Sequence, residues 1–396
     1  MQNRQILLVI PSMASAGGAE KLVDNLSKIF KQEYQTSIVS FDPPGTAPYF
    51  KCGVPFYPIG DSPGRAPRFR LLAYIRMAMN LAALKRKLGA DITLSVLWRA
   101  DLINALSHRS GKIGSLAVIN LRGNRTHIKM VKLRQFVGLI YRRFNMVFSI
   151  NPAISNEYRE LFGLASENIR LFRNFTDRPQ YQRFFSDHAC RYVFCGRLVY
   201  EKNIDGLLRI WADYIHRNPG RQLVLIGDGP LHNELESFAI GLGLTASHNL
   251  QDVNAQVLFA GSTDTPEAYL DGARALLLTS RHEGVPTIVL VAASLGLPLI
   301  AADCHGGGVR HLFAVDRTTP LSDISLECAQ SKGILLPIPD SPATTRVWVE
   351  AMERIDRDEA LRAELSRRAL QLSAEHSYEA VRQDWSLMMH QLSIQP

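Results

Sequence analysis

The chain has 396 residues, of which 46% are hydrophobic and 21% are charged. This balance is typical of a soluble globular protein of two or three domains, and it excludes a disordered chain, a collagen and a coiled-coil rod. The five cysteines form no Cys-Xaa-Xaa-Cys pair and are too scattered for a disulfide framework or a zinc site. We therefore expect a reducing compartment.

No apolar run is long enough to cross a membrane. The longest, residues 288–302, has 15 residues and includes Pro298, whereas a bilayer needs roughly 20. The first apolar run, residues 6–10, ends at Pro11 and is shorter than the core of a signal peptide. It predicts a buried first strand in a cytoplasmic protein.

Basic residues are concentrated in the first half of the chain. Residues 1–175 contain 25 Lys and Arg against 10 Asp and Glu, whereas residues 176–396 contain 20 against 27. Two windows contain no acid at all, with seven bases in residues 62–90 and nine in residues 102–156. A single basic run is usually a solvated surface, but two in one half favour an anionic partner. The candidates are a membrane face, a phosphorylated acceptor or nucleic acid.

The first half alternates strands and helices. Residues 6–10 form a continuous apolar run, and Gly17-Gly18 then leads into a helical pattern. We expect further strands at 36–41, 91–97, 116–121 and 146–150, and helices at 71–88 and 128–144. Bases flank the helix at 71–88, with Lys85, Arg86 and Lys87 at its end. Such alternation predicts a parallel, doubly wound sheet.

The pattern restarts in the second half. Strands are expected at 191–195, 222–226, 257–260, 275–278 and 298–301, and helices near 204, 235 and 287–295. We therefore predict an α/β protein with two Rossmann-like parallel-sheet domains facing across a cleft. The predicted boundaries are an N-terminal domain at 1–174, a linker at 175–189, a C-terminal domain at 190–375 and a helix at 376–396 that packs back towards the N-terminal domain.

Candidate chemical groups follow the predicted strands, where ligands bind in such sheets. Gly17-Gly18 precedes a helix N-terminus, which favours anions. Arg197 and Lys202 are two cations able to clamp a diphosphate, or simply a surface pair. Glu283 precedes a helix and faces its cleft, or merely caps its N-terminus.

Four segments together resemble the retaining, nucleotide-sugar-dependent glycosyltransferases of family 4, which have the GT-B fold. Gly17-Gly18-Ala19-Glu20 matches the N-terminal glycine loop of that family. Cys195-Gly196-Arg197-Leu198 with Glu201-Lys202-Asn203 is similar to its second motif, and Ile226-Gly227-Asp228-Gly229-Pro230 to its third. The fourth runs from Ser280-Arg281-His282-Glu283-Gly284-Val285-Pro286 to Asp303. The resemblance covers most of the chain.

The resemblance implies roles for these residues. Arg197 and Lys202 would neutralise the donor diphosphate and, like Glu283, count as catalytic, with Glu283 contacting the hydroxyls of the donor sugar. The donor-binding residues would be Gly17, Gly18, Gly196, Gly227, Gly284, Pro286, Thr287 and Ile288. We expect Arg197 and Lys202 to be exposed in the empty site. The family implies neither a metal site nor a cofactor, because the two cations replace the metal.

Val291 departs from the family pattern. The family usually has a second glutamate there, eight residues after the first, and that glutamate binds the ribose of the donor. A valine accepts no hydrogen bond, and losing such a contact costs about 1–3 kcal/mol if the ribose hydroxyl stays unpaired. Donor binding is then weaker, uses another ribose partner, or is absent. The alternative to an enzyme is a catalytically impaired homologue acting as a scaffold in a glycan-assembly complex.

The N-terminal domain carries the acceptor in this fold. The segment from Asn120 to His127 resembles the arginine–asparagine version found in polysaccharide-assembly members. It places Arg122 and Asn124, and less strongly His127, near the acceptor.

The expected function follows from the resemblance. It is transfer of a sugar, with retention, from a nucleotide-sugar donor to a glycan or polyprenyl-diphosphate-linked acceptor. The products would be O-antigen, capsule, lipopolysaccharide or exopolysaccharide. No nucleic-acid-binding signature accompanies the basic residues. We therefore assign the basic half to an anionic membrane surface, and place the protein peripherally on the inner face of the plasma membrane.

Overall fold

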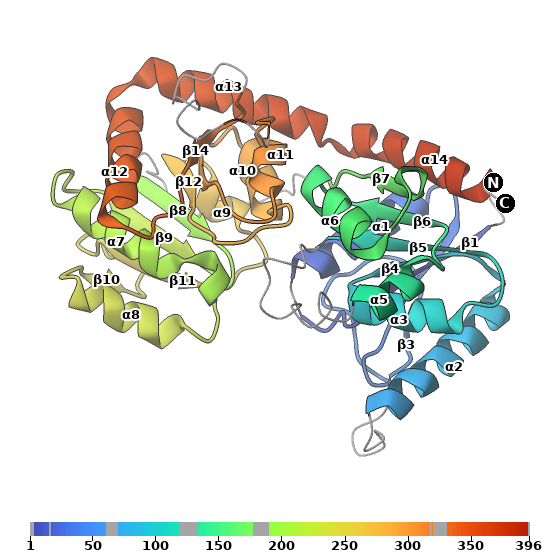
Figure 1. Ribbon diagram of the computed structural model, residues 1–396. Helices are drawn as coiled ribbons and strands as arrows, with labels where there is room; N and C mark the ends of the chain where they lie inside the picture. Colours follow the sequence, from blue (N-terminus) through green and yellow to red (C-terminus); the bar gives the residue numbers. More distant parts are fainter. Residues whose placement is uncertain are drawn as a thin grey trace. The chain divides into compact units, whose positions relative to one another are not determined.

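The computed structural model describes residues 4–15, 17–60, 70–118, 134–176, 190–316, 319 and 331–394. The chain divides into two compact units, which we call unit 1 (Met1–Phe175 with Tyr378–Pro396) and unit 2 (Thr176–Ser377). Each contains one sheet of seven parallel strands flanked by helices (Figure 1). The predicted α/β class with two parallel-sheet domains is confirmed.

Unit 1 has the strand order β3-β2-β1-β4-β5-β6-β7. Its strands are β1 (Gln5–Ile10), β2 (Gln35–Ser40), β3 (Phe56–Pro58), β4 (Ala90–Val96), β5 (Lys112–Ala117), β6 (Met146–Ser149) and β7 (Ile169–Leu171). Its helices are α1 (Gly18–Phe30), α2 (Arg70–Leu88), α3 (Trp98–Ser107), α5 (Arg134–Tyr141), α6 (Pro152–Phe162) and α14 (Tyr378–Ile394), with a 3₁₀ turn at Ser166–Asn168. The order reverses between β1 and β4, which pair with each other.

Local sequence explains these elements. All six residues of β1 are buried, as expected for a central parallel strand covered on both faces. Helix α6 begins where the Asn151 side chain accepts a hydrogen bond from the backbone N–H of Ile154, and it ends at Gly163 in the left-handed conformation.

Helix α14 returns to the N-terminal part of the chain. Its Trp385 is fully buried against Phe30, Phe148 and Phe172, at ring-centroid distances of 5.1–5.4 Å. Arg173 and Asp384 add an ion pair at 2.7 Å. The final helix is therefore an integral layer of unit 1.

Unit 2 has the strand order β10-β11-β9-β8-β12-β13-β14. Its strands are β8 (Arg191–Cys195), β9 (Gln222–Ile226), β10 (Ala246–Ser247), β11 (Val257–Gly261), β12 (Ala275–Leu278), β13 (Leu299–Ala302) and β14 (Ile334–Leu336). Its helices are α7 (Ile204–Ile215), α8 (His232–Gly241), α9 (Glu267–Leu270), α10 (Thr287–Ser294), α11 (Gly308–Leu312), α12 (Pro342–Arg357) and α13 (Glu359–Glu375), with a 3₁₀ turn, η3, at Tyr200–Lys202. The order reverses between the paired strands β8 and β12.

The core of unit 2 is one continuous cluster around the central strands. Trp211 on α7 and Trp348 on α12 are its largest fully buried side chains. Helix α12 begins with a capping box, in which Ser341 and Thr344 exchange side-chain and backbone hydrogen bonds.

The strands β3, β7, β10 and β14 and the helices α3, α6, α9, α11, α12 and α13 were not predicted, and β5 differs in its bounds. The strand expected at 116–121 is β5 at Lys112–Ala117, so it begins four residues earlier. Its interior Gly114 allows close packing, because a Cβ there would lie 2.7 Å from Leu94. Helix α3 was not predicted, since its sequence shows only a weak apolar periodicity.

Within the described ranges, no helix is both long and apolar enough to cross a bilayer.

Candidate functional site

The predicted catalytic residues follow the two strands at which the sheet of unit 2 reverses its order. Arg197 and Lys202 lie in the connection after β8, and Glu283 lies in the connection after β12. Because β8 and β12 are parallel neighbours, these connections leave the same edge of the sheet. Ligands of open α/β sheets bind at such a switch point, outside the carboxyl ends of the strands.

Lys202 and Glu283 are in direct contact. The ammonium Nζ of Lys202 lies 2.6 Å from Oε1 of Glu283, and the hydroxyl of Ser280 donates to the same oxygen at 2.7 Å. Only 21% of the Lys202 side chain and 9% of the Glu283 side chain are exposed. The expectation that Lys202 is exposed is therefore wrong: the loop after β12 covers it and supplies its counter-ion.

This pairing fixes a buried charge at the edge of the sheet. Removing one partner would leave the other charge uncompensated, which typically costs 3–5 kcal/mol for a buried pair. The pair also explains why Glu283 does not act as a simple cap. Helix α10 has Pro286 at its N-cap and no side-chain hydrogen bond to its first turn.

Arg197 differs from Lys202 in its surroundings. Its side chain is exposed, as predicted, and makes no hydrogen bond or ion pair with the described part of the chain. Hydrogen bonds hold the backbone on either side of Arg197: Gly196 donates to Ile226 at the end of β9, and Leu198 donates to Asp228 in the connection after β9. The guanidinium is thus a solvent-exposed cation on a loop held by backbone hydrogen bonds.

Two predicted glycines allow these loops to pack together. A Cβ on Gly227, where φ is +132°, would lie 2.0 Å from the carbonyl oxygen of Gly196. A Cβ on Gly229 would lie 2.5 Å from the carbonyl oxygen of Leu198. The Gly-Asp-Gly-Pro turn therefore has a structural reason for its glycines, beside the donor-binding role predicted for Gly227.

Helix α10 has no side-chain cap from the described residues, so the N–H groups of its first two residues are available as donors. The segment Gly284 to Pro286 leads into Thr287 and Ile288, the first residues of the helix. Uncapped N–H groups at a helix N-terminus attract phosphate. Val291, one turn further on, is half-buried and packs against the core of unit 2, so it offers no hydrogen bond at the position of the second family glutamate.

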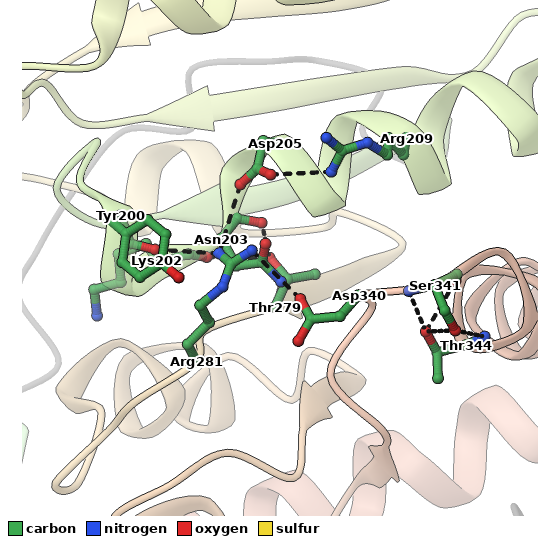
Figure 2. Close-up of polar contacts among 10 residues, drawn as sticks. All are labelled: Tyr200, Lys202, Asn203, Asp205, Arg209, Thr279, Arg281, Asp340, Ser341 and Thr344. Atoms are coloured by element: carbon green, nitrogen blue, oxygen red, sulfur yellow. Dashed lines mark hydrogen bonds and ion pairs between the residues drawn. The ribbon is translucent and has the colours of Figure 1, made fainter. Parts of the chain in front are cut away.

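Arg281 ties together three segments around this site (Figure 2). Its guanidinium donates to the carbonyl of Tyr200 at 3.2 Å and to Asp340 at 3.3 Å, and lies 3.6 Å from Asp205. It also stacks over the Tyr200 ring, 4.6 Å from its centroid. Because Tyr200 is two residues before Lys202 and Arg281 is two before Glu283, this bracket fixes the spacing of the two catalytic candidates.

The two thiols near the ion pair, Cys195 and Cys304, are unreactive. Burial raises the pKa of Cys195 to about 12 and raises that of Cys304 further. Both thiols therefore stay protonated at neutral pH, and neither is a nucleophile.

The sequence contains one Asp-Xaa-Asp triplet, a pattern that often binds metal ions. Asp356 accepts hydrogen bonds from Tyr192 and Tyr214, and ion pairs join it to Arg221 and Arg274. Asp358 caps α13. The structure thus gives both carboxylates structural partners.

In unit 1, Gly17 is the N-cap residue of α1 and Gly18 is its first residue, in the connection that follows β1. Asp42 holds this connection: its carboxylate accepts from the Ser12 hydroxyl at 2.6 Å and from the Met13 backbone at 2.8 Å. The acceptor-side candidates Arg122, Asn124 and His127 lie outside the described residues.

Helices α2, α3 and α5 of unit 1 lie side by side (Figure 1) and expose several large apolar side chains. These are Leu72, Ile75 and Met79 on α2, Leu106 on α3, and Phe136 and Leu139 on α5, each at least 45% exposed. Arg86, Lys87, Arg142 and Arg143 are exposed on or beside the same helices. We call this set the outer surface of unit 1.

Lys85 does not belong to that surface. It is buried, and its ammonium donates to Asn104 at 2.7 Å and to Ser107 at 2.9 Å. Burial lowers its pKa to about 7. Treating the three bases at 85–87 alike was therefore wrong, because Lys85 continues the buried stripe of Met77, Ala78 and Leu81.

Sequence reasoning missed Ser280, Arg281 and Asp42 as supports of the site. Ser280 and Arg281 stood inside the quoted motif, but nothing in the local sequence indicated that they reach Glu283 and the η3 turn. Asp42 directly follows a predicted strand, and that position was the available signal.

Comparisons with known proteins match the chain to glycosyltransferases. The model of the family described as glycosyl transferases group 1 matches residues 189–323. An amylovoran biosynthesis glycosyltransferase of Erwinia amylovora is 24% identical over 318 residues, covering 76% of this chain and 82% of that protein.

A second relative covers nearly the whole chain. It is the GalNAc-alpha-(1->4)-GalNAc-alpha-(1->3)-diNAcBac-PP-undecaprenol alpha-1,4-N-acetyl-D-galactosaminyltransferase of Campylobacter jejuni. The identity is 24% over 397 residues, or 96% of this chain and 97% of that protein.

Solved structures share the fold. HepE of Anabaena in complex with UDP-glucose superposes with a TM-score of 0.75 at 16% identity, covering 98% of this chain and 99% of that one. The lipopolysaccharide outer core galactosyltransferase WaaB gives a TM-score of 0.67 at 16% identity, covering 98% and 99%. The chain therefore carries a glycosyl transferases group 1 domain in its second unit and is a glycosyltransferase of the GT-B fold.

Proposed function

We propose that this glycosyltransferase moves a sugar, with retention of configuration, from a nucleotide-diphosphate sugar to a glycan or polyprenyl-diphosphate-linked acceptor in cell-surface polysaccharide synthesis. The observation that carries the proposal is the Lys202–Glu283 pair at the switch point of unit 2, with Arg197 exposed beside it. One cation is fixed and one is free to close, as a site for a departing diphosphate requires.

The proposed reaction breaks the bond between the sugar C1 and the diphosphate oxygen, and forms a bond from C1 to the acceptor oxygen on the same face. The acceptor proton passes to the departing diphosphate. Arg197 and Lys202 stabilise the negative charge that develops there, so the step needs no metal ion at this site. Glu283 shares its carboxylate between Lys202 and the sugar hydroxyls, and the first turn of α10 binds phosphate.

Two kinds of relative support the substrate classes. The Campylobacter enzyme is named for an undecaprenol-diphosphate acceptor, and HepE has been solved with UDP-glucose. By analogy we propose a nucleotide sugar and a lipid-linked glycan for this chain. The identity of the sugar depends on side chains that differ between such proteins.

The outer surface of unit 1 supports docking on the cytoplasmic face of an anionic membrane. Its exposed apolar residues on α2 recur at positions 72, 75 and 79, a helical spacing that forms one stripe. Apolar residues bordered by Arg and Lys are typical of a surface that inserts among anionic headgroups. A lipid-linked acceptor would then be within reach of the enzyme.

Val291 supports one alternative, a scaffold that binds no donor. A panel of UDP-, GDP-, ADP- and CMP-sugars in a thermal-shift assay separates the two. The proposal predicts that one donor raises the melting temperature, since a bound ligand stabilises by RT ln(1 + [L]/Kd). It also predicts release of that nucleotide diphosphate when an undecaprenyl-diphosphate glycan is added. No shift with any donor would establish the scaffold.

A further inference from the structure

Two histidines and a glutamate of unit 2 converge outside the candidate catalytic site. His232 and Glu236 lie one turn apart on α8, and His248 follows strand β10. One ligand atom from each lies within 4.8 Å of the other two. His248 Nε2 is 3.0 Å from Glu236 Oε1, and the two imidazole rings stack nearly parallel with centroids 5.5 Å apart.

The surroundings of the cluster orient these side chains. A carboxylate oxygen of Asp228 lies 3.2 Å from Nδ1 of His232, within ion-pair distance but without hydrogen-bond geometry. A carboxylate hydrogen-bonded to the second ring nitrogen is the usual support of a metal ligand, and a rotation of the Asp228 side chain would supply that bond and leave Nε2 as the ligand atom. The ring of Phe259 on β11 packs against both imidazoles, at 5.4 and 5.7 Å, and limits their rotation.

We propose that His232, Glu236 and His248 bind a divalent transition-metal ion of the zinc class, with Asp228 as the supporting carboxylate. Two imidazoles and a carboxylate suit Zn²⁺ and disfavour Mg²⁺ and Ca²⁺, which prefer oxygen ligands. Around a tetrahedral Zn²⁺ with bonds of about 2.0–2.1 Å, ligand atoms lie roughly 3.3 Å apart. Small side-chain rotations bring the three atoms to that spacing, and water completes the coordination.

Such an ion would join parts of unit 2 that are distant in sequence. It would link α8 to the segment after β10, at the edge of the sheet. Through Asp228, whose carboxylate also accepts from the Gly229 backbone at 2.7 Å, it would brace the Gly-Asp-Gly-Pro turn. This role is separate from the transfer reaction proposed above, in which Arg197 and Lys202 supply the positive charge.

Titration of the metal-free full-length protein with Zn²⁺ by calorimetry tests the site directly. We expect one equivalent to bind, and a rise in melting temperature. Co²⁺ should give the visible absorption of a four-coordinate ion, which Zn²⁺ then abolishes.

Variants identify the ligands. His248→Ala and Glu236→Gln should each weaken Zn²⁺ binding at least 100-fold, and Asp228→Asn should weaken it 10–100-fold, as is typical of a supporting residue. The matched control is His216→Ala, an exposed histidine at the end of α7, which should bind like the wild type. Circular dichroism of each variant verifies folding.

Either of two results would overturn the proposal. One is the absence of stoichiometric Zn²⁺ or Co²⁺ binding to the folded wild type at neutral pH. The other is unchanged binding in the folded double variant His248→Ala/Glu236→Gln. Neither depends on donor binding or transfer, so the site can fail while the proposed function holds, and the reverse.

Discussion

Units 1 and 2 are built on sheets of seven parallel strands, yet two buried ionisable groups of unit 1 lack the counter-ion that the candidate site of unit 2 has. In unit 1, Lys85 on α2 and Asp101 on α3 are buried. Their hydrogen bonds among the described residues go to neutral groups. In unit 2, Glu283 is paired with Lys202 and Arg310 with Asp303, as buried Asp24 of unit 1 is with Lys21 and Lys28.

The counter-ion of Lys202 suits the diphosphate site proposed for unit 2. A site for a diphosphate must keep a full positive charge out of bulk water, and a counter-ion such as Glu283 holds it there until substrate competes for it. Without counter-ions, the groups in unit 1 shift towards their neutral forms instead: burial raises the pKa of Asp101 to about 7 and lowers that of Lys85 to about 7. In the proposed function the transfer depends on charges of unit 2, whereas the bases of unit 1 that it uses, such as Arg86 and Lys87, are exposed.

Removing the cations of unit 2 should have the largest effect. Lys202→Ala and Arg197→Ala should each lower the turnover number by about 10²–10³-fold, the cost of losing a group that stabilises developing charge. Steady-state kinetics with the donor found in the thermal-shift panel measures this.

The control is Arg217→Ala, which removes an exposed cation of unit 2 and should keep full turnover. Lys202→Ala should also destabilise unit 2, since it leaves Glu283 unpaired, whereas Arg197→Ala should not. If both variants turned over at the wild-type rate, the assignment of the diphosphate site would be wrong.

The shifted pKa of Asp101 predicts that the free energy of unfolding of unit 1 changes with pH, by up to about 1.4 kcal/mol per pH unit. The pKa of Asp101 is raised from 3.8 to about 7, so between pH 4 and 7 the folded state binds more protons than the unfolded state. Stability of unit 1 should therefore fall as pH rises through this window. Asp101→Asn should flatten that slope.

Hydrogen exchange of the β4 and β5 amides measures this stability in unit 1 alone. Lys85→Met is the opposing test: because the pKa of Lys85 is lowered, wild-type stability should rise between pH 7 and 10, and the variant should lack that rise. An unchanged slope below pH 7 in Asp101→Asn would contradict the assignment.

The fold was predictable because alternating apolar strands and amphipathic helices carry a local signal. Most of the expected strands of both sheets lie within a residue or two of the observed ones, whereas β5 does not. There the sequence is most apolar after the strand centre, and the true strand contains Gly114 and Ser115, whose small size serves packing against neighbouring strands. Such tertiary packing leaves no local pattern.

The candidate site was predictable only as a set of motifs. Glu283 and Lys202 were each marked, but their contact joins residues 81 positions apart, which no spacing indicates. The burial of Lys85 could have been foreseen, since it lies four residues after the buried Leu81 on the same helical face. Lys85, Arg86 and Lys87 are consecutive, and only their positions around the helix distinguish the buried lysine from the two exposed bases.

Loss of the contacts that Arg281 makes in unit 2 should have a medium effect on the turnover number. Arg281→Ala should lower the turnover number about tenfold, because the loops carrying Lys202 and Glu283 lose their common tether. Arg281 is a positioning residue, so KM for the donor should change little. Arg281→Lys should restore only part, since lysine cannot bridge two partners and stack at once. Loss of donor binding with turnover unchanged would instead assign Arg281 to the donor itself.

The surface of unit 1 should give the smallest effect for each residue. A base near an anionic membrane is worth about 1 kcal/mol, roughly fivefold in affinity. Arg86→Gln and Lys87→Gln should each weaken binding to anionic vesicles by that factor, and Met79→Ser should weaken the part that salt does not remove. Lys85 is left intact because its ammonium is buried. Vesicle co-sedimentation measures all three.

Salt separates attachment by charge from attachment by apolar contact. At about 0.5 M salt the Debye length falls to roughly 4 Å, so binding that depends on Arg86 and Lys87 should be lost, while neutral vesicles should bind weakly at any salt. Arg367→Gln, an exposed base of unit 2, is the matched control and should bind normally. If the wild type ignored anionic vesicles at low salt, the proposed membrane docking would be wrong, and the basic half would serve a soluble acceptor or no partner at all.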